Sequence, residues 1–143
     1  ANFLLNAGPD GDGAIPPEPR RILRAVGAWY RQVKEALVDV ELANGLTTNR
    51  EALLTRRGNT LYVHCNREPR MHGVALPPLG VLPRRATLLN TGEPVRFDVN
   101  RLPSLCHQPA RECLRLFGIP FERLSGTVPV IRLDFDSLPD TDS

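Results

Sequence analysis

The chain has 143 residues, of which 41% are hydrophobic, and its formal net charge is +2. This length suits one ordinary domain with a real core, and none of its apolar runs is long enough to span a membrane. Its basic residues do not cluster and aromatic residues make up only 6%, whereas a nucleic-acid groove needs clustered cations and stacking rings. Composition therefore argues against nucleic-acid and membrane partners.

The N-terminal residues are typical of a strand, a loop and the start of a helix. An apolar run at 3–5 leads into a turn rich in Gly, Asp and Pro at 8–13, and Pro16 and Pro17 follow. Proline is favourable at the first helical position because its missing N–H would be unpaired there. The single strand of such a unit has no neighbouring strand in this part of the sequence with which to form a sheet. Since the chain also starts without methionine, we predict that it is the C-terminal piece of a larger protein.

A helix is predicted from about Pro17 to Leu37. Apolar residues recur there at steps of three and four, which places them on one stripe of the helix; they are Ile22, Val26, Trp29, Tyr30, Val33 and Leu37. This periodicity favours packing of Trp29 and Tyr30 in a core over stacking of their rings on a sugar.

Beyond Leu37 the hydrophobic period changes to two, the period of a strand. In the run at 60–65, Leu61, Val63 and Cys65 share one face. Tyr62 is expected on the opposite, outer face with Thr60 and His64. It is the aromatic side chain that we expect to be best placed for contact with a ligand.

Several other short runs are typical of strands. They lie at 52–55, 74–76, 86–89, 95–99, 114–117 and 131–135. Gly58 and Asn59 suit a two-residue hairpin turn, because glycine readily adopts a positive φ. Short alternating strands at this spacing predict a two-layer antiparallel sandwich.

Asp10 and Asp12 are the strongest local candidates for a catalytic or metal-binding role. In a (β/α)8 barrel the loop after each strand lies at the catalytic face, and this loop would lie there if the strand-loop-helix unit belongs to such a barrel. The D-x-D-G pattern also resembles the start of a calcium loop. That loop needs a glutamate eleven positions after its first aspartate, where this chain has Arg21. Because Asp and Gly are also preferred in turns, we favour a tight turn held by aspartate side chains.

The histidines and cysteines lack the spacing of a metal site. His64 and Cys65 point to opposite faces of one strand, and the group of Cys106, His107 and Cys113 lacks a fourth zinc ligand. Cys106 and Cys113 could form a disulfide, but three cysteines without a CxxC pair are more typical of thiols in or near a core.

The remaining candidates are weaker still. His72 has no partner at metal-ligand spacing. Ser104, Ser125 and Ser137 lack the G-x-S-x-G context of a hydrolase nucleophile. The sequence therefore leads us to assign no catalytic, cofactor-binding or metal-binding residue to this chain, and to expect no cofactor.

Residues 2–13, followed by Ile15, Pro16 and Pro17, read as an apolar strand, Leu-Asn-Ala-Gly-Pro, an acidic glycine-rich loop and an Ile-Pro helix start. This stretch resembles the segment that closes the catalytic barrel in α-L-fucosidases of glycoside hydrolase family 29. Residues 27–29 match the Gly-x-Trp of that family's helix, and residues 35–37 are similar to its Glu-Ala-Ile. Further on, residues 55–64 resemble the first long hairpin of the family's C-terminal sandwich, and 86–89 with 92–95 resemble a later turn and strand.

The resemblance implies a retaining glycosidase built from a (β/α)8-type barrel and a C-terminal β-sandwich. Retention needs two carboxyl groups about 5–5.5 Å apart, and in this family both come from strands upstream of the segment seen here. We therefore expect a mainly β fold, an antiparallel sandwich of Greek-key type preceded by one strand-loop-helix unit left over from the barrel. The expected parts are 1–37 from the barrel, 38–136 as the sandwich and 137–143 as a flexible tail.

Two functions are compatible with these residues. In the first, the chain is the C-terminal domain of an α-L-fucosidase-like enzyme and lacks the nucleophile and acid/base. Its partners would be the missing catalytic barrel of the same polypeptide, a fucosylated glycan as the parent's substrate and, through an exposed apolar strand or helix, a second copy of the chain. In the second, it is a non-catalytic carbohydrate-binding or interaction module, which would require aromatic residues along one sheet face.

Overall fold

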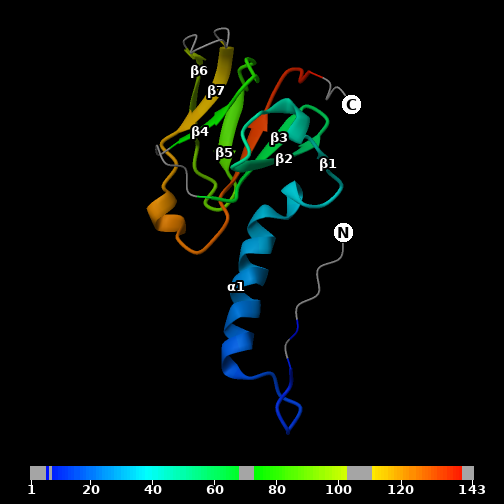
Figure 1. Ribbon diagram of the computed structural model, residues 1–143. Coiled ribbons are helices and arrows are strands. Elements are labelled where there is room, and N and C mark those ends of the chain that lie inside the picture. The colour runs from blue at the N-terminus through cyan, green and yellow to red at the C-terminus, as the bar shows by residue number, and fades with distance from the viewer. Residues whose placement is uncertain (1–5, 7, 68–72, 103–110, 140–143) are drawn as a thin grey trace. The chain divides into compact units, whose positions relative to one another are not determined.

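The computed structural model describes residues 6, 8–67, 73–102 and 111–139 (Figure 1). Contacts divide the chain into two units, Ala1–Gln32 and Val33–Ser143, which are described separately. The first unit holds most of helix α1 (Pro17–Val33) and the second holds all the strands. The strand predicted around residues 3–5 lies outside the described residues.

Helix α1 begins at the predicted Pro17 and ends at Val33, short of the predicted Leu37. Glu18 lies in its first turn and Arg31 in its last, an arrangement that complements the helix dipole. A short 3-10 helix, η1 (Lys34–Ala36), follows directly. The predicted helix is therefore correct in type and start, but its final residues form a tighter turn that belongs to the second unit.

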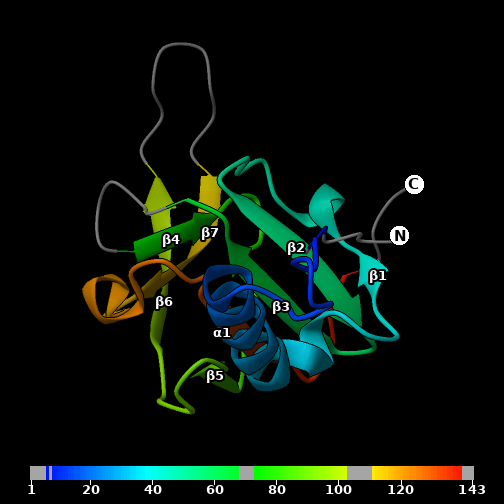
Figure 2. The ribbon, with the colours of Figure 1, turned by 90° about the horizontal axis from the view of Figure 1, so that it is seen from below.

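The second unit is a sandwich of two antiparallel sheets. In Figure 2, strands β4, β6 and β7 lie apart from β2 and β3. One sheet has the order β1 (Glu41–Leu42), β2 (Ala52–Arg57), β3 (Thr60–Cys65), β8 (Val130–Asp134) and β5 (Arg85–Leu88); the other has β4 (Gly73–Leu76), β7 (Arg111–Phe117) and β6 (Arg96–Leu102). The predicted fold class, a mainly β antiparallel sandwich preceded by one helix, is confirmed.

Local sequence explains the hairpin that starts the larger sheet. Strands β2 and β3 pair from Ala52 with Cys65 to Arg57 with Thr60, so Gly58 and Asn59 form the turn. Gly58 has φ +56°, in the left-handed region where glycine meets no steric cost. The sequence did not indicate β1 or the 3-10 helices η2 (Asn44–Leu46) and η3 (Phe121–Leu124), because elements this short carry no periodicity.

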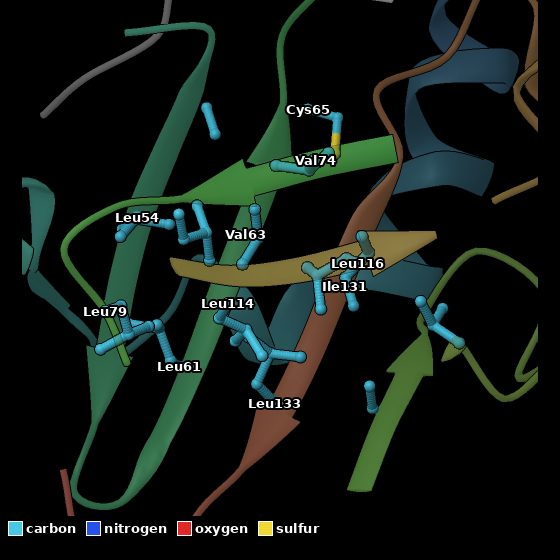
Figure 3. Packing of buried hydrophobic residues seen from close by; sticks show 14 of the residues in the cluster. Leu54, Leu61, Val63, Cys65, Val74, Leu79, Leu114, Leu116, Ile131 and Leu133 are labelled. Atoms are coloured by element: carbon cyan, nitrogen blue, oxygen red, sulfur yellow. The ribbon is translucent and has the colours of Figure 1, made fainter. Parts of the chain in front are cut away.

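The core lies between the sheets, where Figure 3 shows labelled side chains from both layers gathered together. Leu61 and Leu133 are register partners, as are Val63 and Ile131, and all four are fully buried in one cluster with Cys65. The predicted shared face of residues 61, 63 and 65 is confirmed, and residues 131, 133 and 135 belong to the same cluster.

Candidate functional site

The loop before α1 is a turn organised by Asp10. One of its carboxylate oxygens, Oδ1, accepts hydrogen bonds from the backbone N–H of Asp12 at 3.2 Å and of Ala14 at 2.9 Å. The backbone N–H of Asp10 donates to the Ala14 carbonyl at 2.9 Å. Asp10 therefore acts as a turn former, as the sequence led us to favour. Asp12 is exposed in the same turn.

Tyr62 and His64 are not available to a ligand. Both were predicted on an exposed outer face, but they are only 2% and 4% exposed. The face of β3 that carries Tyr62 and His64 does point away from the core. The segment at 33–39 covers this face: it is hydrogen-bonded to the sheet through Thr55, and its Val33 and Ala36 are fully buried. Burial raises the pKa of the Tyr62 phenol, with a smaller contribution from the nearby Glu35 carboxylate. The predicted exposure of Tyr62 is wrong because alternation in the sequence shows which face of the strand carries a residue, but does not show which other segment covers that face.

A buried polar trio holds this segment on the sheet. The Thr55 hydroxyl donates to the Ala36 carbonyl at 2.8 Å, and His64 Nε2 lies 2.9 Å from the same hydroxyl oxygen. Since a hydroxyl has only one proton to give, the neutral ring with a protonated Nε2 satisfies both contacts. Burial lowers the pKa of His64, while a hydrogen bond to the Ala36 backbone opposes that shift.

We expect Thr55→Val to lower the free energy of unfolding by about 1–3 kcal/mol, because it removes the hydroxyl and leaves buried polar partners unsatisfied. Urea denaturation measures the change. Thr87→Val is the matched control. Thr87 lies on β5 and pairs with Arg132 on β8, and we expect its replacement to change the free energy of unfolding by no more than about 0.5 kcal/mol. Equal losses in the two variants would contradict a bonding role for Thr55.

Two arginines that the sequence did not single out complete the attachment. Arg57 donates from Nε to the Asp39 carbonyl at 3.1 Å and from Nη2 to the carbonyls of Glu35 and Val38. Arg132 donates from Nη1 to the Glu35 carboxylate at 3.1 Å. These bonds hold residues 35–39, which follow the helix, against the larger sheet. The only available signal was an arginine on the same strand face as Tyr62.

Three residues of the apolar stripe of α1 are exposed within the described residues. Ile22, Val26 and Tyr30 are 47%, 43% and 39% exposed, and Trp29 is partly buried. The prediction that Tyr30 packs in a core is therefore not met within the described residues. The described part of the first unit has a single helix, so Ile22, Val26 and Tyr30 have no second helix or strand of that unit to cover them.

Two hollows open where β2 begins and β3 ends. One, of about 520 Å³, is lined by Asn44, Arg50 and Asn66 among others. The other, of about 390 Å³, is also lined by Asn66, together with Arg67 and Glu122. Their lining is rich in amide, hydroxyl and guanidinium groups, which are suited to hydrogen bonds with a polar ligand. The sequence did not indicate this site, because its residues come from segments far apart in the chain.

Cys65 and Cys113 are free, buried thiols. Burial raises the pKa of Cys65 to about 12 and also raises that of Cys113, so neither is activated as a thiolate. Cys65 faces the core while His64 faces away, as predicted. Cys106, His72, His107 and Ser104 lie outside the described residues.

Neither a metal cluster nor a membrane-spanning helix occurs in the part of the chain that the structure describes. Among those residues, no three His, Cys, Asp or Glu side chains are grouped closely enough to hold a metal ion. No described helix combines the length and the apolar character that crossing a bilayer requires.

The fold and its surface define a β-sandwich domain with a preceding amphipathic helix. Solved structures that match this chain include α-L-fucosidases. An α-L-fucosidase from Vibrio sp. strain EJY3 matches 99% of this chain at 26% identity and a TM-score of 0.72. Isoenzyme 1 from Paenibacillus thiaminolyticus matches 95% at 28% identity and a TM-score of 0.69. The α-fucosidase of Thermotoga maritima, at 22% identity and a TM-score of 0.62, shares the fold over 93% of the chain.

The matched region is a minor part of each of these proteins. This chain spans 24% of the Vibrio protein, 31% of the Paenibacillus protein and 30% of the Thermotoga protein. The predicted resemblance to part of an α-L-fucosidase is confirmed. No protein-family model and no curated protein sequence matches the chain.

Proposed function

We propose that this chain is the C-terminal domain of an α-L-fucosidase-like retaining glycoside hydrolase and is not catalytic by itself. The similarity to α-L-fucosidases over 99% and 95% of its length, at 26% and 28% identity, carries the proposal. Since the chain spans less than a third of those proteins, the nucleophile and the acid/base belong to the remainder of the parent. A fucosylated glycan is then the parent's substrate.

In this proposal the parts of the chain have different roles. Residues 1–37 complete the catalytic barrel, 38–136 form the sandwich that shields and stabilises it, and 137–143 are a flexible tail. The exposed stripe of Ile22, Val26 and Tyr30 is the surface that packs against the catalytic domain. Burial of an amphipathic helix along such a stripe is the usual source of its stability in a folded protein.

Hydrolysis of 4-nitrophenyl α-L-fucoside tests the proposal. The assay compares the 143-residue chain with the longest upstream-extended form that its gene encodes, at equal concentration. We expect release of nitrophenol only by the extended form. Turnover by the short chain would overturn the non-catalytic role and make Asp12 the first residue to replace. Absence of hydrolysis by both forms would contradict the assignment of α-L-fucosides as the parent's substrates.

For the free chain we further propose that the α1 stripe pairs with a second copy, because apolar surface left without its partner favours association. Sedimentation velocity over a range of concentrations should show a monomer–dimer equilibrium. Val26→Asp places a charge in the stripe and should shift the chain to monomer. Ala28→Asp adds the same charge on an exposed position away from the stripe and should leave the equilibrium unchanged. A monomer at every concentration would contradict the pairing.

A further inference from the structure

We propose that the end of the sandwich where β2 begins and β3 ends binds an anionic saccharide, a sugar that carries a carboxylate or a sulfate. The site comprises Arg50, Arg67 and Asn66, which line the two hollows at this end. The inference rests on the proposed function, since a domain of a glycoside hydrolase works among glycans, but it concerns binding and not hydrolysis.

Strand pairing places the two arginines at the same end of the sandwich. The β2–β3 ladder ends at the pair Ala52 and Cys65; Arg50 lies two residues before Ala52, and Arg67 lies two residues after Cys65. Both side chains are exposed. Among the described residues, neither guanidinium takes part in an ion pair. Each guanidinium is therefore available to pair with an anionic group of a ligand.

The wall around Arg50 is held rigidly from several directions. Asn49 donates from Nδ2 to the Ala75 carbonyl at 2.8 Å, and its Oδ1 accepts from the Glu51 N–H at 2.8 Å. Thr47 donates from its hydroxyl to the Pro77 carbonyl at 2.9 Å. These bonds tie the segment that carries Arg50 to the opposite sheet. A site whose backbone is already fixed loses less entropy when a ligand binds.

Asn66 supplies the groups that recognise hydroxyls. It lines both hollows, and its side-chain amide makes no hydrogen bond to the described residues. An amide can donate and accept at once, which suits neighbouring hydroxyls on a sugar ring. Volumes of about 390 and 520 Å³ fall within the range of small-molecule sites, about 300–1,000 Å³.

The charge balance favours an anionic sugar over a neutral one. The aromatic residue that lines these hollows, Phe121, is 9% exposed, so it offers little of the ring face on which sugars commonly stack. Glu122 lines the second hollow with Arg67 and provides an acceptor for hydroxyl groups. The positive excess lies in the first hollow, where Arg50 is the only charged lining residue, because Arg67 and Glu122 balance each other in the second. Guanidinium groups bind carboxylates and sulfates through paired charge-assisted hydrogen bonds.

Isothermal titration of the 143-residue chain tests the inference. The probes are trigalacturonate, a sulfated fucose disaccharide and, as the neutral comparison, maltotriose. We expect saturable binding of at least one anionic probe, no measurable binding of maltotriose, and weaker binding as salt is raised. The anionic probe that binds more tightly identifies the anion. Binding of neither anionic probe, or equal binding of maltotriose, would overturn the inference.

Variants locate the binding. Arg50→Ala and Arg67→Ala should each weaken the affinity about tenfold, the size of one charge-assisted hydrogen bond. Arg24→Ala on α1 removes an exposed arginine elsewhere and should leave the affinity unchanged. Equal affinities in all three variants would also overturn the site. The titration needs no catalysis. Absence of binding in the titration therefore does not contradict the fucosidase proposal, and absence of hydrolysis in the assay does not contradict the binding result.

Discussion

Replacing Leu61 with alanine is expected to lower the free energy of unfolding by about 2–5 kcal/mol, the usual cost of a cavity left by a buried leucine. Leu61 is fully buried, lies on a strand that is paired on both sides, and belongs to the cluster that joins the two sheets. The site cannot collapse easily, because its neighbours are fixed in the strand ladder. Urea denaturation followed by circular dichroism measures the loss.

The matched control is Leu42→Ala. Leu42 lies on the short edge strand β1 and is 72% exposed, so its truncation leaves no cavity and should change the stability by less than about 0.5 kcal/mol. A loss at Leu42 as large as at Leu61 would mean that the core does not lie between the two sheets.

Stability is also expected to fall as the pH drops below about 6.5, the ordinary pKa of histidine. Burial lowers the pKa of His64 in the folded state. In the window between the unfolded and folded pKa values the unfolded chain therefore binds more protons. The free energy of unfolding then decreases as pH falls, by up to about 1.4 kcal/mol per pH unit for one proton. Once His64 is protonated in the folded state as well, it causes no further decrease in the free energy of unfolding.

Unfolding midpoints measured between pH 7.5 and 5 in the chain and in His64→Gln test this dependence. The difference between the two proteins removes the contributions of carboxylates. Glu35, Arg57, Arg132 and Asp134 share this side of the sheet, but the shift of His64 comes from burial and the Ala36 backbone. The His64→Gln variant should lose most of the slope near pH 6. Parallel profiles would assign the pH dependence to other groups.

The sequence patterns predicted where the strands lie better than they predicted which segments pack against them. The period-two face of Leu61 and Val63 and the turn at Gly58 depend only on neighbouring residues, and both are present in the structure. Burial of Tyr62 depends on the segment at 33–39, which lies 23 to 29 residues earlier in the chain and is held by Thr55 and Arg57. No local pattern reports such a contact. For the same reason the helix was predicted to run past Val33.

The candidate binding surface shows the same limit. Asp10 was identified correctly as a turn former, because its bonds are to residues two and four positions away. The sequence did not single out Arg50 and Arg67, because the pairing of β2 with β3, and not a motif, places both at the same end of the sandwich. The family resemblance rests on contiguous stretches, and it therefore predicted the fold and the class of parent protein without indicating this surface.

Mixing tests most directly whether this chain completes an α-L-fucosidase. The upstream part of the parent is produced without these residues, and its hydrolysis of 4-nitrophenyl α-L-fucoside is measured before and after addition of the 143-residue chain. We predict that the upstream part alone is inactive or rapidly inactivated, that the chain restores activity, and that the Val26→Asp variant restores it poorly. Full and lasting activity of the upstream part alone, unchanged by the chain, would contradict the claim.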